Sequence, residues 1–470
     1  MSSPIRTVAR VLVGVIASLA PALAGVAASG GLVAPAAGCA GAHSASAPGG
    51  TGSLRRAREE LHAARLEGAQ REFSAAVDTD PHSMAAWQGL VEASERAGTL
   101  GEIAGRVERR ARDGPEDGTA WYALGLLRSA QRRNDEAGAA FSRAASIKRD
   151  DAEIQYRWGA ALLAADRAAE ARRPLSRALE LAPDDAAHRV ALAACLAALG
   201  ERAAAMEALR DVPRLSPSAA DARRTVRLAR ALTDPFRNVR PEERAAVEPV
   251  LRELERDASA PPFDRLEAVL ARFPAFAAGH LLVALAAERL GDSPRAFAEF
   301  RMAAALAPDL PQPHAYLARI SVRDRPELSA EEYAEALKRN PLDPGALRGL
   351  GEIDLDRLGR PDRAAESLRR AAELVPDDPG LQALAVRAEL TAGFSAAAHE
   401  RVAKAIRGWR RDPQLLLRLA AAAYDERSKA VGEAVHAGLT QCIDQVLDAI
   451  QEVDPENAVA RGLRRAARER

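Results

Sequence analysis

Cysteine and histidine are the residue types in this sequence that could act as nucleophiles, general bases or metal ligands. The chain has three cysteines and eight histidines. Three cysteines form neither a disulfide framework nor a four-cysteine zinc site, and no two histidines stand at metal-ligand spacing. The sequence also lacks glycine-rich phosphate loops and the G-x-S-x-G, S-x-x-K and H-E-x-x-H motifs. We therefore expect no enzyme, no cofactor and no metal site.

The three cysteines have different surroundings. Cys195 and Cys442 lie on apolar stripes at helical spacing, which predicts buried, unreactive thiols. Cys39 instead follows two arginines and a long uncharged apolar run, residues 11–28, a pattern typical of a secretory signal. The four residues Ala36-Ala37-Gly38-Cys39 resemble the lipobox of bacterial lipoproteins, although alanine replaces the usual leucine. The resemblance implies that Cys39 is lipidated and becomes the mature amino terminus.

Two other interpretations of the amino-terminal segment remain open. Ala22-Leu23-Ala24 is an A-x-A site, and cleavage after Ala24 would release a soluble exported protein. Residues 1–38 could also stay as an uncleaved anchor, because the apolar part is long enough to span a membrane. Residues 39–53 are rich in glycine and serine, which predicts a flexible tether. We expect export to the cell envelope, with a membrane-anchored lipoprotein as the favoured form.

The charge balance argues against a nucleic-acid partner. The 470 residues include 66 Lys+Arg and 66 Asp+Glu, so the formal net charge is zero. Nucleic-acid binders and polybasic membrane surfaces need an excess of cations. Hydrophobic residues make up 48% and charged residues 28%, which is typical of a folded chain. We expect a protein or peptide partner and no nucleic acid.

A 34-residue period organises most of the chain. Prolines lie at positions 81, 115, 183 and 217 and, after a break, at 274, 308, 341 and 376. Trp87 and Trp121 are 34 residues apart, and His280 and His314 occupy the same position in later repeats. A fixed period of this length indicates internal repeats. It also predicts that the two histidines have a packing role.

Each repeat predicts two antiparallel helices. In residues 116–149, Trp121 and Gly125 share one helical face, and Ala137 and Phe141 share the face of a second helix. Gly125 and Ala137 are small enough for the two helices to approach closely, and Phe141 fills the gap to the next hairpin.

The helix ends are marked as well. Proline ends the second helix of a repeat. Asp185 and Asp378 follow such prolines and can cap the next helix. Ser329 with Glu332 predicts a capping box at the start of a second helix.

These residues resemble the tetratricopeptide repeat, whose signature has an aromatic residue, Leu-Gly, small residues, a second aromatic and a proline at this spacing. The match is looser in residues 82–115, where Ile103 and Arg110 replace small residues. The resemblance implies an all-α solenoid, a right-handed superhelix of about ten to twelve helical hairpins. It also implies a concave groove that binds a peptide or protein.

The repeats fall into two blocks. The predicted segments are a first block at 54–217, an irregular helical joint at 218–262, a second block at 263–410 and capping helices at 411–470. Within the joint, residues 221–232 and 241–256 are amphipathic, and the segment is either a rigid elbow or a hinge. Capping helices are expected because a solenoid must cover its last apolar face.

Repeat geometry identifies the side chains that face the groove of the first block. They are Tyr122, Leu126, Ser129, Tyr156, Ala160, Leu163, Val190 and Ala194. This row is apolar with two tyrosine hydroxyls, a composition typical of a peptide-binding face. Family members that clamp a terminal carboxylate place Lys and Asn on this row, and this sequence has neither there. The corresponding row of the second block is charged and mixed: Leu281, Leu285, Glu288, Arg348, Glu352 and Arg387.

The sequence therefore predicts a non-enzymatic scaffold, exported and lipid-anchored, that binds a segment of an envelope assembly in its groove. Three alternatives remain: an adaptor at the inner membrane or in the cytoplasm, a helical domain that serves an enzyme, and a solenoid that associates with itself. The placement in an envelope assembly is an analogy with other lipoproteins of this type.

Overall fold

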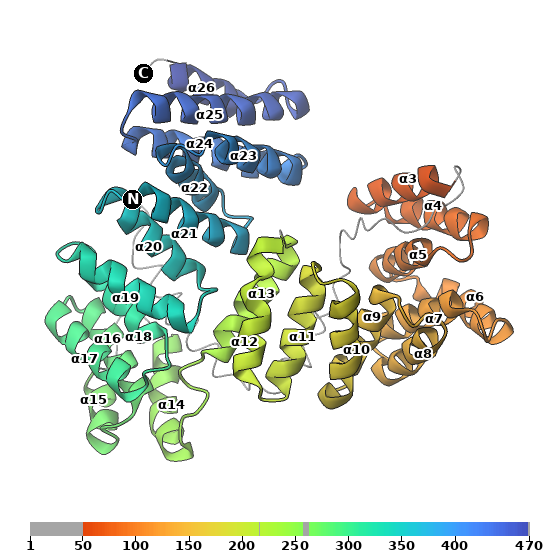
Figure 1. Cartoon of the computed structure of the whole chain (residues 1–470), viewed down its shortest axis with the longest axis horizontal. Helices are drawn as coiled ribbons and strands as arrows, with labels where there is room; N and C mark the ends of the chain where they lie inside the picture. Colours follow the sequence, from red (N-terminus) through yellow and green to blue (C-terminus); the bar gives the residue numbers. More distant parts are fainter. Residues whose placement is uncertain (1–49, 216, 257–262, 469–470) are drawn as a thin grey trace. The chain divides into compact units, whose positions relative to one another are not determined.

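The computed structural model describes residues 50–215, 217–256 and 263–468, and in these ranges the chain is all-α (Figure 1). They contain 24 α-helices, α3 to α26, one short 3-10 helix at Val212–Leu215 and no strand. The predicted all-α repeat solenoid is confirmed. The predictions for residues 1–49, including Cys39 and the cleavage site, lie outside the described residues. The described residues divide into two compact units, one up to Ser218 and one from Ala219.

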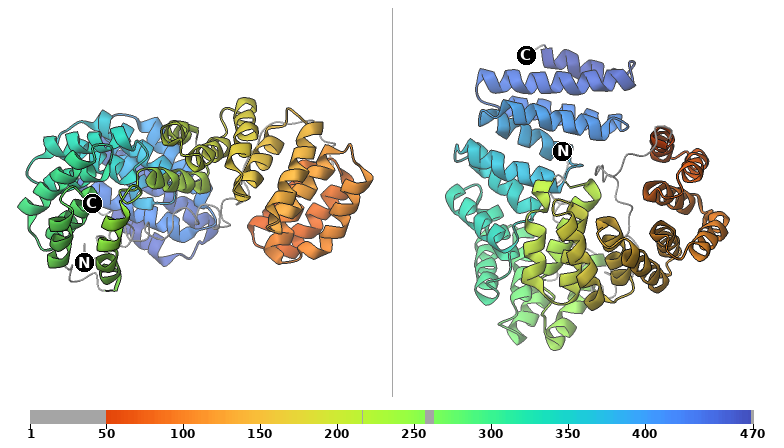
Figure 2. Two further views of the ribbon diagram at one scale, coloured as in Figure 1. Left: turned by 90° about the horizontal axis from the view of Figure 1, so that it is seen from below. Right: turned by 45° about the vertical axis from the view of Figure 1, so that its right-hand side comes forward.

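The first unit is a series of five helical hairpins. They are α3 (Gly50–His62) with α4 (Leu66–Thr79), α5 (Met84–Ala97) with α6 (Leu100–Asp113), α7 (Gly118–Ala130) with α8 (Asn134–Ile147), α9 (Ala152–Ala164) with α10 (Ala168–Leu181) and α11 (Ala186–Ala198) with α12 (Arg202–Arg210). We call the first helix of each hairpin its A helix and the second its B helix. Neighbouring A helices also contact each other directly, α5 with α7 and α9 with α11. Figure 2 shows these hairpins following one another in chain order.

The second unit starts with three single helices, continues with four hairpins and ends with three more helices. The first three are α13 (Ala219–Leu232), α14 (Pro241–Arg256) and α15 (Phe263–Arg272). The hairpins are α16 (Ala277–Arg289) with α17 (Ser293–Leu306), α18 (Gln312–Ser321) with α19 (Pro326–Arg339), α20 (Pro344–Asp356) with α21 (Pro361–Leu374) and α22 (Pro379–Thr391) with α23 (Ser395–Trp409). The last three are α24 (Pro413–Lys429), α25 (Glu433–Val453) and α26 (Ala458–Arg468).

Aspartates start many of the A helices. Asp185 caps α11 by accepting the backbone N–H of Ala187 at 2.8 Å, and Asp378 caps α22 in the same way, as predicted. The capping box at Ser329 was wrong. Helix α19 already begins at Pro326, because proline suits the first helical position. Ser329 is instead buried inside the helix and donates its hydroxyl to the carbonyl of Ala318 at 2.6 Å.

Small residues let the two helices of a hairpin touch. A Cβ atom added to Gly125 would lie 2.6 Å from the ring of Phe141, and one added to Gly159 would lie 2.4 Å from Leu175. Both contacts are far shorter than van der Waals distance. The glycine therefore sets the separation of A and B helices within a repeat, which confirms the predicted role of Gly125.

The segment between the repeat blocks packs on the second unit. The amphipathic stretches 221–232 and 241–256 are the helices α13 and α14. Phe236 and Leu251 share a buried core with residues of α16 and α17. Arg223 of α13 forms an ion pair with Asp377 at 2.6 Å. These contacts hold α13 and α14 against the second-unit repeats.

At the carboxyl end, α24 does not pack mainly on the preceding helix α23. It packs on α22 and on α25. The helices α22 to α26 share one apolar core. Across the described ranges, no helix is long and apolar enough to cross a membrane.

Candidate interaction surface

The position shared by Trp87, Trp121 and His280 has a structural role. The indole N–H of Trp87 donates to the carbonyl of Pro81 at 2.9 Å, and that of Trp121 donates to Pro115 at 3.0 Å. His280 Nε2 makes the same contact with the carbonyl of Pro274, at 2.9 Å. Each ring therefore satisfies a carbonyl in the turn that precedes its own helix. Both histidines also contact a glutamate of the following helix: His280 Nδ1 lies 2.6 Å from Glu299 and His314 Nδ1 lies 2.7 Å from Glu332.

The two described cysteines are both buried. Burial, with the nearby charge of Glu389, raises the pKa of the Cys442 thiol to about 12, and burial also raises the pKa of Cys195. Both are therefore thiols at neutral pH and poor nucleophiles. Asp354 is buried and faces Arg360 at 3.5 Å. Among the described residues, no group of three His, Cys, Asp or Glu side chains could hold a metal ion.

The predicted groove residues of the first unit lie on α7, α9 and α11, and most of them are covered. Tyr122, Leu126, Tyr156, Val190 and Ala194 are buried. The other three members are half-buried: Ser129, Ala160 and Leu163. In this arrangement only the last three offer a partner substantial surface. Whether this row binds a partner stays a prediction.

The two tyrosines take part in packing. The ring of Tyr122 is fully buried and lies 5.8 Å from that of Phe141. Its hydroxyl donates to Glu153 at 3.4 Å. Burial, and next the charge of Glu153, raise its pKa well above the ordinary tyrosine value. Tyr156 lies 4.9 Å from the ring of His188 on the next A helix. Both tyrosines thus join neighbouring repeats.

A charged pair beside the tyrosines was missed from the sequence. Arg157 is 5% exposed and contacts Glu153 at 2.7 Å, and its guanidinium lies 5.6 Å from the Tyr156 ring. Burial is the largest single influence and would lower the pKa of Arg157, but Glu153 together with Tyr122 and Tyr156 raises it overall. The sequence did contain a signal for this ion pair, because Glu153 and Arg157 are four residues apart on one predicted helix. The A-helix face of α9 is therefore polar as well as apolar.

The charged row of the second unit is largely paired within the chain. Glu288 forms an ion pair with Arg319, and Arg348 lies 2.8 Å from Glu352. Arg387 is 4% exposed and lies 2.8 Å from Asp356 of α20. It also contacts Glu426 of α24 at 2.7 Å. The pairs of Glu288 and Arg387 join different helices, whereas Arg348 and Glu352 lie on the same helix α20. Together they leave little free charge for a ligand.

A second buried ion pair joins the helices of the last hairpin. Glu389 of α22 is 2% exposed. Arg401 of α23 places Nη2 2.5 Å from one of its carboxylate oxygens and Nε 3.1 Å from both. This is the geometry of a strong charge-assisted hydrogen bond.

The comparisons with known proteins agree with the repeat pattern. A tetratricopeptide-repeat family model matches residues 104–152, 264–311 and 322–379, about a third of the chain. No curated protein matches.

Solved structures of other proteins also align with parts of the chain. The protein TTC0263 of Thermus thermophilus is 19% identical over 39% of this chain and 98% of its own, with a TM-score of 0.33. The Pseudomonas aeruginosa protein pilF is 16% identical over 48% of this chain and 97% of its own, also at 0.33. YrrB, described as having an unusual peptide-binding site, is 15% identical over 43% of this chain and 97% of its own, at 0.30.

The family matches fall on the helices α6 to α8, α15 to α17 and α19 to α21, where proline, glycine and small residues recur at the repeat spacing. These three stretches of the chain therefore match the tetratricopeptide repeat, and the described residues form an all-α solenoid.

Proposed function

We propose that the chain is a non-enzymatic scaffold that binds a segment of a partner protein along the A helices of its first unit. Tetratricopeptide repeats are protein-interaction modules. The observation that supports this use here is the row of half-buried side chains, Ser129, Ala160 and Leu163, on adjacent A helices. Because the hairpins are already packed, binding needs little ordering of the scaffold.

We further propose that the protein is exported and anchored in the cell envelope by a lipid on Cys39. The support is the sequence alone: two arginines, an uncharged apolar run and a cysteine, followed by a glycine- and serine-rich stretch. A tether of that composition would let the folded repeats reach partners away from the membrane.

Site-specific crosslinking tests the binding surface. A photoreactive benzoylphenylalanine at Ser129, and separately at Leu163, should yield the same crosslinked partner, because both positions lie on the proposed face. The matched control is Ala139, an exposed position on the B helix α8, which should give no such product. Loss of both products, or equal yield at Ala139, would contradict binding along the A helices.

The mature amino terminus tests the anchor. Intact mass of the protein from native membranes should show Cys39 as the first residue, carrying acyl chains. A terminus following Ala24 would instead indicate a soluble exported protein. An uncleaved chain would favour the adaptor at the inner membrane or in the cytoplasm. Neither alternative changes the expected crosslinks.

A further inference from the structure

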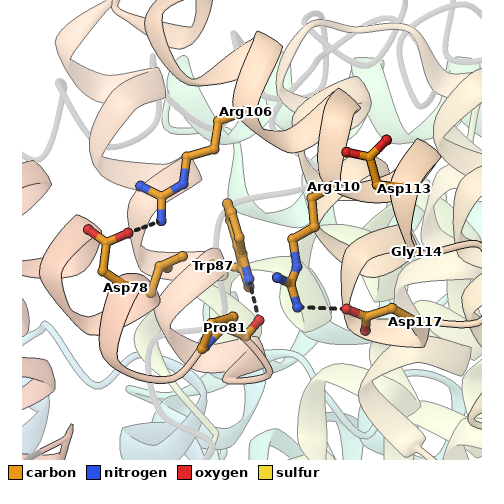
Figure 3. Close-up of a pocket in the computed structure, with 9 residues that line it drawn as sticks. Asp78, Pro81, Trp87, Arg106, Arg110, Asp113, Gly114 and Asp117 are labelled. Atoms are coloured by element: carbon orange, nitrogen blue, oxygen red, sulfur yellow. Dashed lines mark hydrogen bonds and ion pairs between the residues drawn. The ribbon is translucent and has the colours of Figure 1, made fainter.

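A pocket of about 420 Å³ opens in the first unit at the ends of α4 and α6 (Figure 3). Its walls include Asp78 from α4, Trp87 from α5, Arg110 and Asp113 from α6, and Asp117 at the start of α7. The groove residues predicted on the A helices are not among its lining. It is thus a separate candidate site.

The pocket lies where the repeat pattern departs from its rule. Two positions of α6 carry larger residues than the equivalent positions of α8, 34 residues later in the chain. Arg110 corresponds to the buried Ala144, and Ile103 corresponds to the buried Ala137. Helix α6 packs much less closely on α5 than α8 does on α7. Of the two departing residues, Arg110 lines the cavity.

The arginines of the pocket are already neutralised. The two guanidinium groups lie 5.4 and 5.9 Å from the centre of the Trp87 ring, Arg106 being the nearer. Arg106 Nη2 lies 2.6 Å from Asp78, and Arg110 Nη2 lies 2.6 Å from Asp117. Figure 3 shows both ion pairs and the bond from the indole to Pro81. An incoming anion would have to displace these carboxylates.

The remaining charge of the pocket is negative. Asp113 is exposed and makes no ion pair or hydrogen bond with another described side chain, so three aspartates face two arginines. Both α4 and α6 end here, at Thr79 and Asp113. Helix α7 begins at the same place, with Asp117 as its cap, so the partial charges of the helix ends offset each other. The excess of aspartates therefore sets the charge of the pocket.

We propose that this pocket binds a lysine or arginine side chain of a partner protein, as a second contact outside the A-helix row. The cationic group is recognised by Asp113, with Asp78, whose side chain is 66% exposed, beside it. The volume of the pocket accommodates one long side chain. Binding in this pocket does not depend on binding along the A helices, because the two surfaces have no residue in common.

NMR of the full chain labelled with 15N-tryptophan tests the pocket directly. The indole N–H of Trp87 reports on it, since its acceptor Pro81 lines the cavity. The probe is the capped tripeptide acetyl-Gly-Arg-Gly-amide, compared with its citrulline and glutamate counterparts. We expect a saturable shift of the Trp87 signal with the arginine peptide at millimolar concentration, and none with the other two. No saturable shift, or an equal shift with glutamate, would overturn the proposal.

The variant Asp113→Asn separates recognition from folding. It is expected to weaken the arginine peptide about fivefold while leaving the tryptophan spectrum of the free protein unchanged. The matched control is Asp309→Asn, an exposed aspartate of the second unit, which should bind as the unmodified chain does. Equal affinity of Asp113→Asn and the control would overturn the role of Asp113.

Discussion

Replacing Arg401 by methionine is expected to lower the free energy of unfolding by about 3–5 kcal/mol. Its partner Glu389 is 2% exposed, and the change leaves that carboxylate buried without its arginine. The free-energy cost of a buried charge without a partner is much larger than the net stabilisation that the intact ion pair provides. Chemical denaturation followed by circular dichroism measures the loss.

Two controls isolate the cause. Arg348→Met removes an exposed arginine four residues from Glu352 and should cost no more than about 1 kcal/mol. The double change Arg401→Met with Glu389→Met should recover most of the stability, because the pair is replaced by apolar groups together. If Arg401→Met cost no more than Arg348→Met, the buried pair would not be a structural element of the last hairpin.

Replacing Gly125 by leucine is expected to destabilise the first unit by about 1–3 kcal/mol. Already the first side-chain carbon would lie 2.6 Å from the ring of Phe141. Phe141 is itself 1% exposed and has no room to move aside. The helices α7 and α8 must therefore separate, which also disturbs the contacts of α8 with α9. Thermal unfolding followed by circular dichroism measures the effect.

The matched control is Gly105→Leu in the neighbouring hairpin. Gly105 lies inside α6 and is exposed, and a Cβ atom added there meets no other atom within 4 Å. Leucine favours the helix over glycine, so this change should stabilise by up to about 1 kcal/mol. Equal destabilisation by both leucines would show that Gly125 does not set the helix separation.

Much of the architecture could be predicted because it depends on local spacing. The 34-residue period, the prolines that end B helices and the aspartates that start A helices act within one hairpin. The same holds for Gly125 with Phe141, which face each other 16 residues apart. The error at Ser329 also has a local cause: Pro326 provides an earlier start, and the capping-box pattern does not compete with it.

The candidate site was less predictable. Repeat geometry assigned Tyr122 and Tyr156 to one helical face but could not show how deeply neighbouring repeats would cover them. Burial depends on the distance between adjacent A helices, which is set by side chains from several repeats at once. The pocket beside Trp87 was indicated only by Ile103 and Arg110 as departures from the pattern.

The amino-acid sequence alone was sufficient to establish the repeats, the helical hairpins and the small residues at their contacts, since these follow from periodicity along the chain. The folded structure was needed to show that Glu389 meets Arg401, that Arg387 joins three helices, and that α14 belongs to the core of the second unit. These pairings have no fixed sequence spacing. They arise from the way each hairpin is rotated and displaced against the next, and that depends on packing summed over the whole unit.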